Sequence, residues 1–198
     1  GEVARWAAEL HAVPGELPHE LALEIGRIRQ LGGDEPRILA ALRFVQTQIR
    51  YVGVEIGEHS HRPYPLETVM QRRFGDCKDK ATLLIEMLEA VGIPAFPVLI
   101  LSSGDQRVDA EIPSPHQFNH LIVAVPAAGM AVAADDPVAA GYLFVDPTFD
   151  QGLSRWLPPS VQDQQALVVR EDGPELVTTP LLYAQDRREL EVEVDMTS

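Results

Sequence analysis

Apolar residues recur every three to four positions through the first third of the chain, which is the period of helices that bury one face. This pattern predicts a helix over residues 17–31, ended by Gly32 and Gly33. A second helix is predicted from a cap at Asp34, with Pro36 in its first turn and an apolar stripe that runs to Ile49. A short extended segment over residues 51–56 and a short helix over residues 66–72 follow.

The most regular helical pattern covers residues 78–91 and is ended by Gly92. Asp76 stands at the position of an N-cap, which makes Cys77 the first helical residue. Helical spacing places Cys77 on the same face as Ala81, Leu84 and Leu88. The sulfur is therefore expected to point toward the layer that packs on this helix.

Beyond Gly92 the apolar period becomes that of strands. We predict strands over residues 95–101, 118–125, 142–145 and 166–169. Residues 127–140 are rich in small side chains and are predicted to form a mobile loop. Helices followed by sequential strands predict an α+β fold, in which N-terminal helices and a central helix pack on an antiparallel sheet.

The length of 198 residues suits one domain, which we predict to cover residues 1–182. The alternating residues Leu190, Val192, Val194 and Met196 predict that residues 183–198 begin a following β-rich domain or a linker. No signal peptide is visible after Gly1, and we therefore expect a piece of a longer protein whose targeting segment lies elsewhere.

Net charge and cysteine content exclude several classes of partner and site. The formal net charge of -14 argues against nucleic acid or an anionic membrane surface as the main partner. No apolar run is long enough to cross a bilayer. Cys77 is the single cysteine, which excludes a disulfide framework and any site that needs several thiolates. We expect no metal and no cofactor.

A helix N-terminus stabilises an anion, and the thiolate is the nucleophilic form of cysteine. The flanking acids Asp76 and Asp79 oppose a thiolate at Cys77, whereas Lys78 and Lys80 favour it, and the sequence leaves their net effect open. A glycine two residues before the cysteine, Gly75, would let a carbonyl substrate approach the backbone closely.

A nucleophilic thiol needs a base, and the base needs a group that orients it. His120 lies near the start of one predicted strand and Asp146 at the end of another. If these strands pair antiparallel, the start of one meets the end of the other, and strand alternation keeps both residues on one face. The sequence therefore predicts a site made of Cys77, His120 and Asp146.

Other interpretations stay open. Each of the three residues taken singly is more often structural, as a core cysteine, a strand histidine or a turn aspartate. His116 competes with His120 as the base. His59 and His61 could bind a metal together with Cys77, although a histidine pair in a polar loop is more often solvated.

Three motifs, in this order, resemble those of bacterial transglutaminase-like proteins, a superfamily with a papain-like thiol fold. They are the cysteine motif GDCKDKA at residues 75–81, the histidine strand FNHLIV at residues 118–123 and the aspartate motif LFVDPT at residues 143–148. The lead-in IRY at residues 49–51 and the segments LPP at 157–159 and ALVV at 166–169 are also similar to that family. The resemblance covers residues 40–182.

The resemblance implies acyl transfer from, or hydrolysis of, a peptide or protein carboxamide through a Cys77 acyl intermediate. The oxyanion would be bound by the Cys77 N–H and by one side chain, for which Tyr51 is the candidate and Gln71 the alternative. The plainer interpretation of Tyr51 is an aromatic residue that is half-buried in a strand. The partners would be a protein or peptide substrate and flanking domains of the same chain, in the periplasm or outside the cell. An amide hydrolase or a non-enzymatic binding module with this fold remain alternatives.

Overall fold

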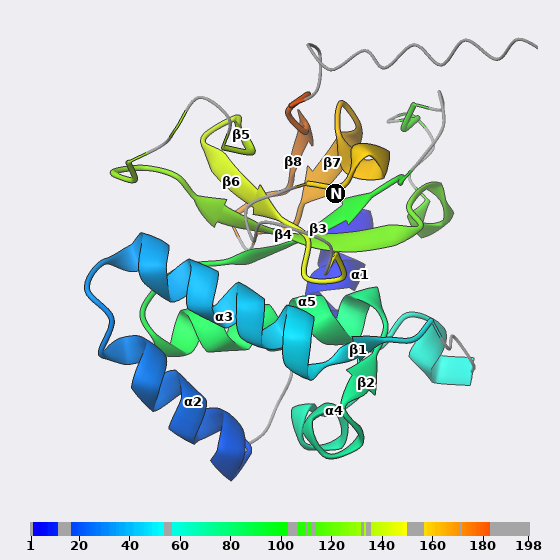
Figure 1. The fold of residues 1–198 in the computed structure, drawn as a ribbon. Helices are drawn as coiled ribbons and strands as arrows, with labels where there is room; N and C mark the ends of the chain where they lie inside the picture. Colours follow the sequence, from blue (N-terminus) through cyan, green and yellow to red (C-terminus); the bar gives the residue numbers. More distant parts are fainter. Residues whose placement is uncertain are drawn as a thin grey trace, which may run out of the picture.

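The computed structural model describes residues 2–11, 17–53, 57–102, 107–109, 111, 114–131, 133, 136–149, 157–170 and 172–182. A layer of helices lies against one face of a six-stranded sheet (Figure 1). The α-helices are α1 (Glu2–His11), α2 (His19–Arg29), α3 (Asp34–Gln48), α4 (Leu66–Arg72) and α5 (Cys77–Ala90), and the 3-10 helices are η1 (Gly57–Ser60), η2 (Pro115–Gln117) and η3 (Pro159–Val161). None of these described helices has both the length and the apolar character that crossing a membrane requires.

The sheet runs in the order β5-β6-β4-β3-β7-β8, and all of its neighbouring strands are antiparallel. Its strands are β3 (Phe96–Ile100), β4 (His120–Pro126), β5 (Val138–Ala139), β6 (Tyr142–Val145), β7 (Gln165–Val168) and β8 (Glu175–Thr178). A separate parallel pair joins β1 (Arg50–Tyr51) to β2 (Phe74–Gly75). The predicted α+β class with an antiparallel sheet is confirmed.

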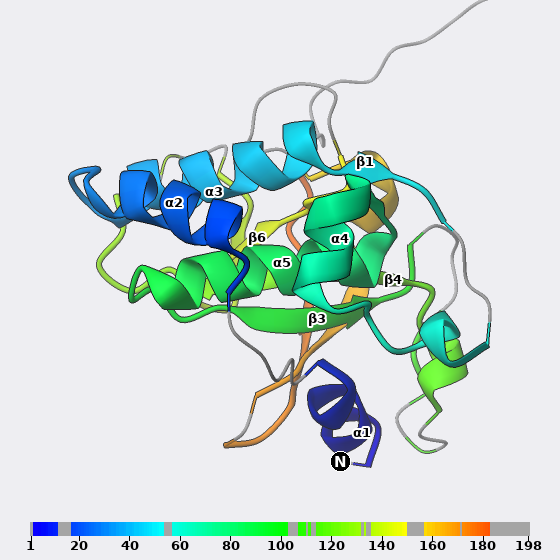
Figure 2. The same cartoon turned by 90° about the horizontal axis from the view of Figure 1, so that it is seen from below.

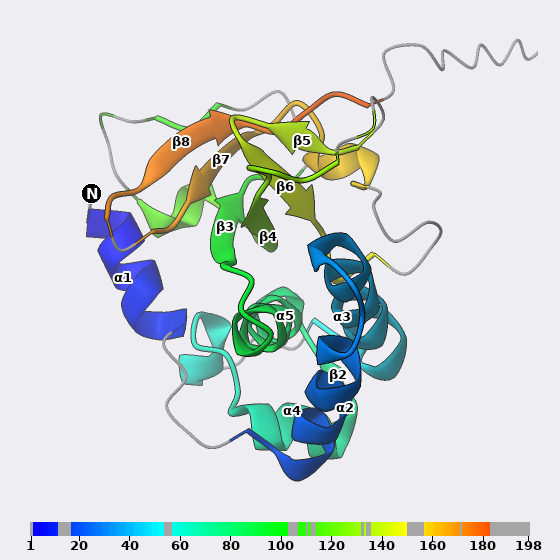
Figure 3. The ribbon, with the colours of Figure 1, turned by 90° about the vertical axis from the view of Figure 1, so that its left-hand side faces the viewer.

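The helix α5 lies at the centre, between the sheet and the helices α2, α3 and α4 (Figures 2 and 3). The first nine residues of α5 are all buried, so this helix has no solvent face at its N-terminal end. Leu84 and Leu88 belong to one core with Leu121 and Val123, which are on alternate positions of β4. The intervening residues Ile122 and Ala124 face a second core on the other side of the sheet, as strand alternation requires.

The helix α1 was not predicted from the sequence. Its small buried residues Ala4 and Ala7 pack beside Val169, with Leu99 and Leu167 alongside. Figure 3 shows α1 apart from the other helices, at the side of the sheet near β7. Trp6 and Ala8 pack against the same cluster, so α1 contacts the sheet through one apolar face.

Several predicted boundaries were wrong. The cap of α3 is Gly33, whose φ of 90° favours glycine, and Asp34 is already helical and lies 3.7 Å from Arg37. Residues 127–140 are not wholly a loop, because β5 at 138–139 pairs with β6. The extended segment predicted at 51–56 is a strand only at Arg50–Tyr51, and residues 54–56 lie outside the described residues. The predicted alternating segment after residue 183 also lies outside them.

Candidate active site

A capping box holds Cys77 at the start of α5. The Asp76 side chain accepts hydrogen bonds from the backbone N–H groups of Lys78 at 3.1 Å and Asp79 at 3.2 Å, and the Asp79 side chain accepts one from the Asp76 N–H at 3.2 Å. The predicted cap at Asp76 is confirmed, and Cys77 is the first helical residue. The macrodipole of α5 therefore favours negative charge where the thiol lies.

The acids that flank Cys77 are both paired with cations. The Lys78 ammonium group donates to the Asp76 carboxylate, and both side chains are buried. Arg72 Nη2 lies 2.6 Å from Asp79 Oδ2. Burial, the largest influence, raises the pKa of Asp79, with hydrogen bonds from the backbone of Tyr64 and Asp76 and the charge of Arg72 acting against it. Pairing of both carboxylates weakens the repulsion that the sequence led us to expect between these acids and a thiolate.

Gly75 is required by an internal contact. A Cβ atom at Gly75 would lie 2.6 Å from Asp79 Cβ and 2.9 Å from its Oδ2, closer than real contacts allow. The sequence suggested that Gly75 leaves room for a substrate. The structure supplies another reason: the glycine leaves room for the carboxylate that closes the capping box.

The strands β4 and β6 bring His120 and Asp146 together. Val123 is opposite Val145 in their antiparallel register. His120 begins β4 and Asp146 directly follows β6, so this register brings the two residues to the same end of the strand pair. His120 Nε2 donates to Asp146 Oδ2 at 3.0 Å, and the side chains are only 12% and 1% exposed.

Cys77 lies beside the imidazole and acts on the pKa of His120 through hydrogen bonding and charge. Because Nε2 is bound to Asp146, Nδ1 is the ring nitrogen that remains for the thiol. Burial is the largest single influence on the pKa of His120 and lowers it, but the hydrogen bonds to Asp146 and Cys77 and the negative charge of both groups raise it to about 10. The imidazole therefore carries its proton at neutral pH.

Two further contacts hold Asp146, and the sequence did not reveal either. Thr148 donates to Asp146 Oδ1 from its backbone N at 2.8 Å and from its Oγ1 at 2.6 Å. Gln46 Nε2, on α3, donates to the Asp146 backbone carbonyl at 3.2 Å. Thr148 lies within the aspartate motif, two residues after Asp146, so the sequence could have indicated its contact with Asp146. Gln46 is a hundred residues away in sequence and carries no such signal.

The two oxyanion candidates differ in their surroundings. Tyr51 is opposite Gly75 in the parallel β1–β2 pair, which sets its backbone beside the segment that leads into Cys77, although its side chain is 47% exposed. Gln71 is exposed on α4, and its amide donates to Glu67 at 2.6 Å. The backbone position favours Tyr51 over Gln71.

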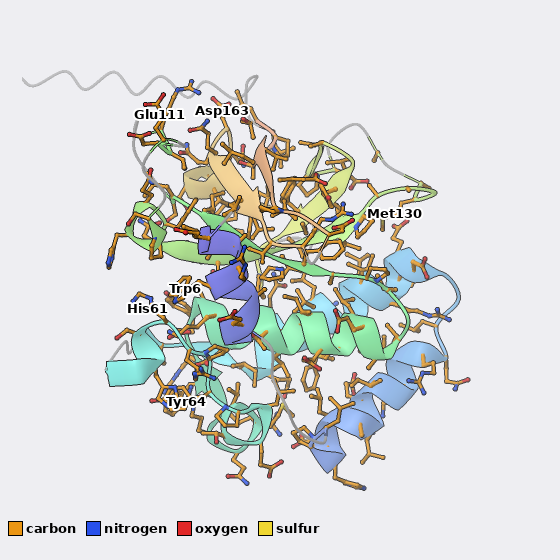
Figure 4. The ribbon with its side chains drawn as sticks, turned by 180° about the vertical axis from the view of Figure 1, so that it is seen from behind. Trp6, His61, Tyr64, Glu111, Met130 and Asp163 are labelled. Atoms are coloured by element: carbon orange, nitrogen blue, oxygen red, sulfur yellow. The ribbon has the colours of Figure 1, made fainter. Side chains whose placement is uncertain are left out.

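The three histidines that the sequence offered as alternatives make ring contacts with residues other than Asp146. The His59 ring stacks on Tyr64 with centroids 3.6 Å apart, and the His61 ring lies 5.3 Å from Trp6 and 6.3 Å from His116. Figure 4 shows Trp6 and His61 side by side, joining α1 to the segment after η1. Within the described residues, no three histidine, cysteine or acidic side chains gather closely enough to hold a metal ion.

The family model of the transglutaminase-like superfamily matches residues 26–137, which is more than half of the chain. The matched stretch contains Cys77 and His120 and ends before Asp146. No curated protein matches the sequence.

Solved structures give similarities at low sequence identity. A Parabacteroides distasonis protein, provisionally named a protease, is similar with a TM-score of 0.53 and 15% identity, over 79% of this chain and 31% of its own. The periplasmic domain of TgpA from Pseudomonas aeruginosa has a TM-score of 0.45 and 19% identity, over 74% of this chain and 49% of its own. This chain therefore spans about a third of the first protein and about half of the second. The likeness to the first concerns the fold.

Proposed function

The chain belongs to the transglutaminase-like superfamily, and on that basis we propose that it is a thiol acyltransferase that acts on peptide or protein carboxamides through Cys77, His120 and Asp146. One observation carries the proposal: an imidazole that is hydrogen-bonded to Asp146 lies beside the thiol of Cys77 at a helix N-terminus, closely enough for the thiol to act on its pKa. This arrangement provides a nucleophile, a proton donor and a group that orients the donor.

In the first half-reaction, the Cys77 thiolate adds to the carboxamide carbonyl carbon and forms a C–S bond. The resulting oxyanion accepts hydrogen bonds from the Cys77 backbone N–H, which as one of the first N–H groups of α5 lacks a partner within the helix, and from a second donor, for which Tyr51 is the candidate. The His120 imidazolium gives its Nδ1 proton to the departing nitrogen as the C–N bond breaks.

In the second half-reaction, neutral His120 removes a proton from an incoming amine, which attacks the thioester carbonyl and expels the Cys77 thiolate. Asp146 holds the ring so that Nδ1 stays directed at the sulfur in both steps. Water in place of the amine gives net hydrolysis, and the choice depends on how the bound substrate excludes water.

An amidase or peptidase of the same fold is the second candidate, and the name of the structurally similar Parabacteroides distasonis protein favours it. A dansylated alkylamine with a glutamine-containing peptide separates the two. Transfer predicts fluorescent amide product at the expense of free acid, whereas hydrolysis predicts free acid at every amine concentration. A non-enzymatic module predicts neither product and no mass increase on Cys77.

Alkylation of Cys77 by iodoacetamide tests the site without knowledge of the substrate. We expect a fast rate that persists into mildly acidic solution, below the range near pH 8.5 in which a free thiol ionises. His120→Ala should abolish this acidic reactivity. His116→Ala, which removes an exposed imidazole four residues away, should leave it unchanged. A rate that follows a free thiol and ignores both substitutions would refute the proposal.

The substrate, the flanking domains and a periplasmic or extracellular location belong to the same proposal. Release of the protein by osmotic shock from cells that express the full-length gene would test the location.

A further inference from the structure

The two oxygens of the Asp146 carboxylate accept hydrogen bonds from different residues. We propose that Thr148 is a positioning residue that holds this carboxylate in the plane required by His120. The inference rests on the proposed function of the Cys77 site. Oδ2 accepts from His120 Nε2 at 3.0 Å. Oδ1 accepts twice from Thr148, from its Oγ1 at 2.6 Å and its backbone N at 2.8 Å.

The Asp146 carboxylate needs such a support because of its own torsional freedom. The terminal torsion of an aspartate is broad, so one hydrogen bond to an imidazole leaves the plane of the carboxylate poorly defined. Two donors on the opposite oxygen define that plane and direct a lone pair of Oδ2 at the ring. Asp146 is only 2% exposed, and these bonds also supply the partners that a buried carboxylate requires.

Part of this contact is ordinary local structure. A bond from the backbone N–H two residues on to an aspartate oxygen is an Asx-turn, which commonly follows a strand. The hydroxyl bond is additional, and it can be removed while the turn is kept. Thr148 is only half-buried, so loss of its hydroxyl does not open a cavity in the core. Its effect on the site is therefore separable from its effect on the fold.

The test compares Thr148→Val, which keeps the shape and the backbone N–H, with Thr148→Ser, which keeps the hydroxyl. The matched control is Thr47→Val, because exposed Thr47 also donates its hydroxyl, to the Arg43 carbonyl at 2.8 Å on α3. The measurement is the iodoacetamide rate at Cys77 against pH, with thermal melts alongside. If Thr148→Val does not fold, Thr148→Ala carries the same comparison.

At about pH 6.5, near the ordinary pKa of histidine, Thr148→Val should lower the rate about tenfold, the effect of losing one hydrogen bond to a charged group. In strongly alkaline solution, where any thiol ionises, its rate should match the wild type. Thr148→Ser should stay within about threefold of the wild-type rate, since only the γ-methyl group is lost, and Thr47→Val should leave the profile unchanged.

A folded Thr148→Val protein with the wild-type profile would overturn the role of Thr148, and so would an equal loss in the serine variant. Both outcomes would leave the proposed function standing, because His120→Ala would still abolish the acidic reactivity. A wild-type protein whose rate at acidic pH does not depend on His120 would instead refute the proposed function.

Discussion

Replacing Gly75 by alanine tests the close contact between β2 and the start of α5. The new Cβ would lie 2.6 Å from Asp79 Cβ, 2.9 Å from Oδ2 and 3.2 Å from Cγ. The φ angle of Gly75 is not positive, so an alanine fits its backbone conformation. The loss of stability therefore comes from the side-chain contact and not from backbone strain. Either Asp79 or the strand β2 has to move by several tenths of an ångström or more.

Both movements break defined interactions. Asp79 accepts from the Tyr64 N–H at 2.8 Å, from Arg72 at 2.6 Å and from the Asp76 N–H at 3.2 Å, whereas moving β2 strains the bond from the Val52 N–H to the Gly75 carbonyl at 2.9 Å. Loss of a helix cap costs about 0.5–2 kcal/mol, and loss of a hydrogen bond to a charged group costs about 1.5–3 kcal/mol. We expect Gly75→Ala to lower the free energy of unfolding by about 2–4 kcal/mol, a range that allows for partial relaxation.

Urea unfolding at neutral pH measures this quantity. Gly26→Ala is the matched control, because Gly26 is exposed within α2 and a Cβ there meets nothing within 4 Å; it should raise stability by about 0.5–1 kcal/mol. In an Asp79→Gly background, which removes the clashing Cβ, the cost of Gly75→Ala should fall by more than half. A Gly75→Ala protein within about 0.5 kcal/mol of wild type, or an unchanged cost in that background, would show that the contact is not the cause.

Three further predictions concern the same region. Asp146→Ala should lose most of the His120-dependent alkylation of Cys77, whereas Asp146→Asn should keep part of it, because an amide oxygen still accepts a hydrogen bond; a folded alanine variant with the wild-type pH profile would remove Asp146 from the site. Because the pKa of His120 is raised to about 10, its stabilising effect should be complete below about pH 6.5 and lost as the pH rises through about 10. Urea unfolding of wild type and His120→Ala across that range checks the sign, and a difference that does not shrink would contradict it. Lys80→Met should cost about 1–3 kcal/mol in urea unfolding, since it leaves the Ile49 carbonyl without the 2.6 Å bond from Lys80 Nζ; unchanged stability would contradict this.

Local patterns in the sequence were enough for much of the fold. The Asp76 cap, the helix that starts at Cys77 and the strands that carry His120 and end before Asp146 were all predicted, because capping and apolar periodicity depend on residues a few positions apart. The antiparallel pairing of β4 with β6 was only a condition for placing His120 beside Asp146, and the structure supplies it.

Only the tertiary structure decided the contacts between distant segments. The pairing of Arg72 with Asp79, the bond from Gln46 to the Asp146 carbonyl and the packing of Gly75 against Asp79 each depend on how separate elements approach one another. The edge strand β5 and the helix α1 were not predicted: β5 is two residues long and is defined by its pairing with β6, and α1 packs its apolar face beside Val169, which is distant in sequence. Local propensity is determined over a few residues, whereas the electrostatics around Cys77 is determined by charges brought together through packing.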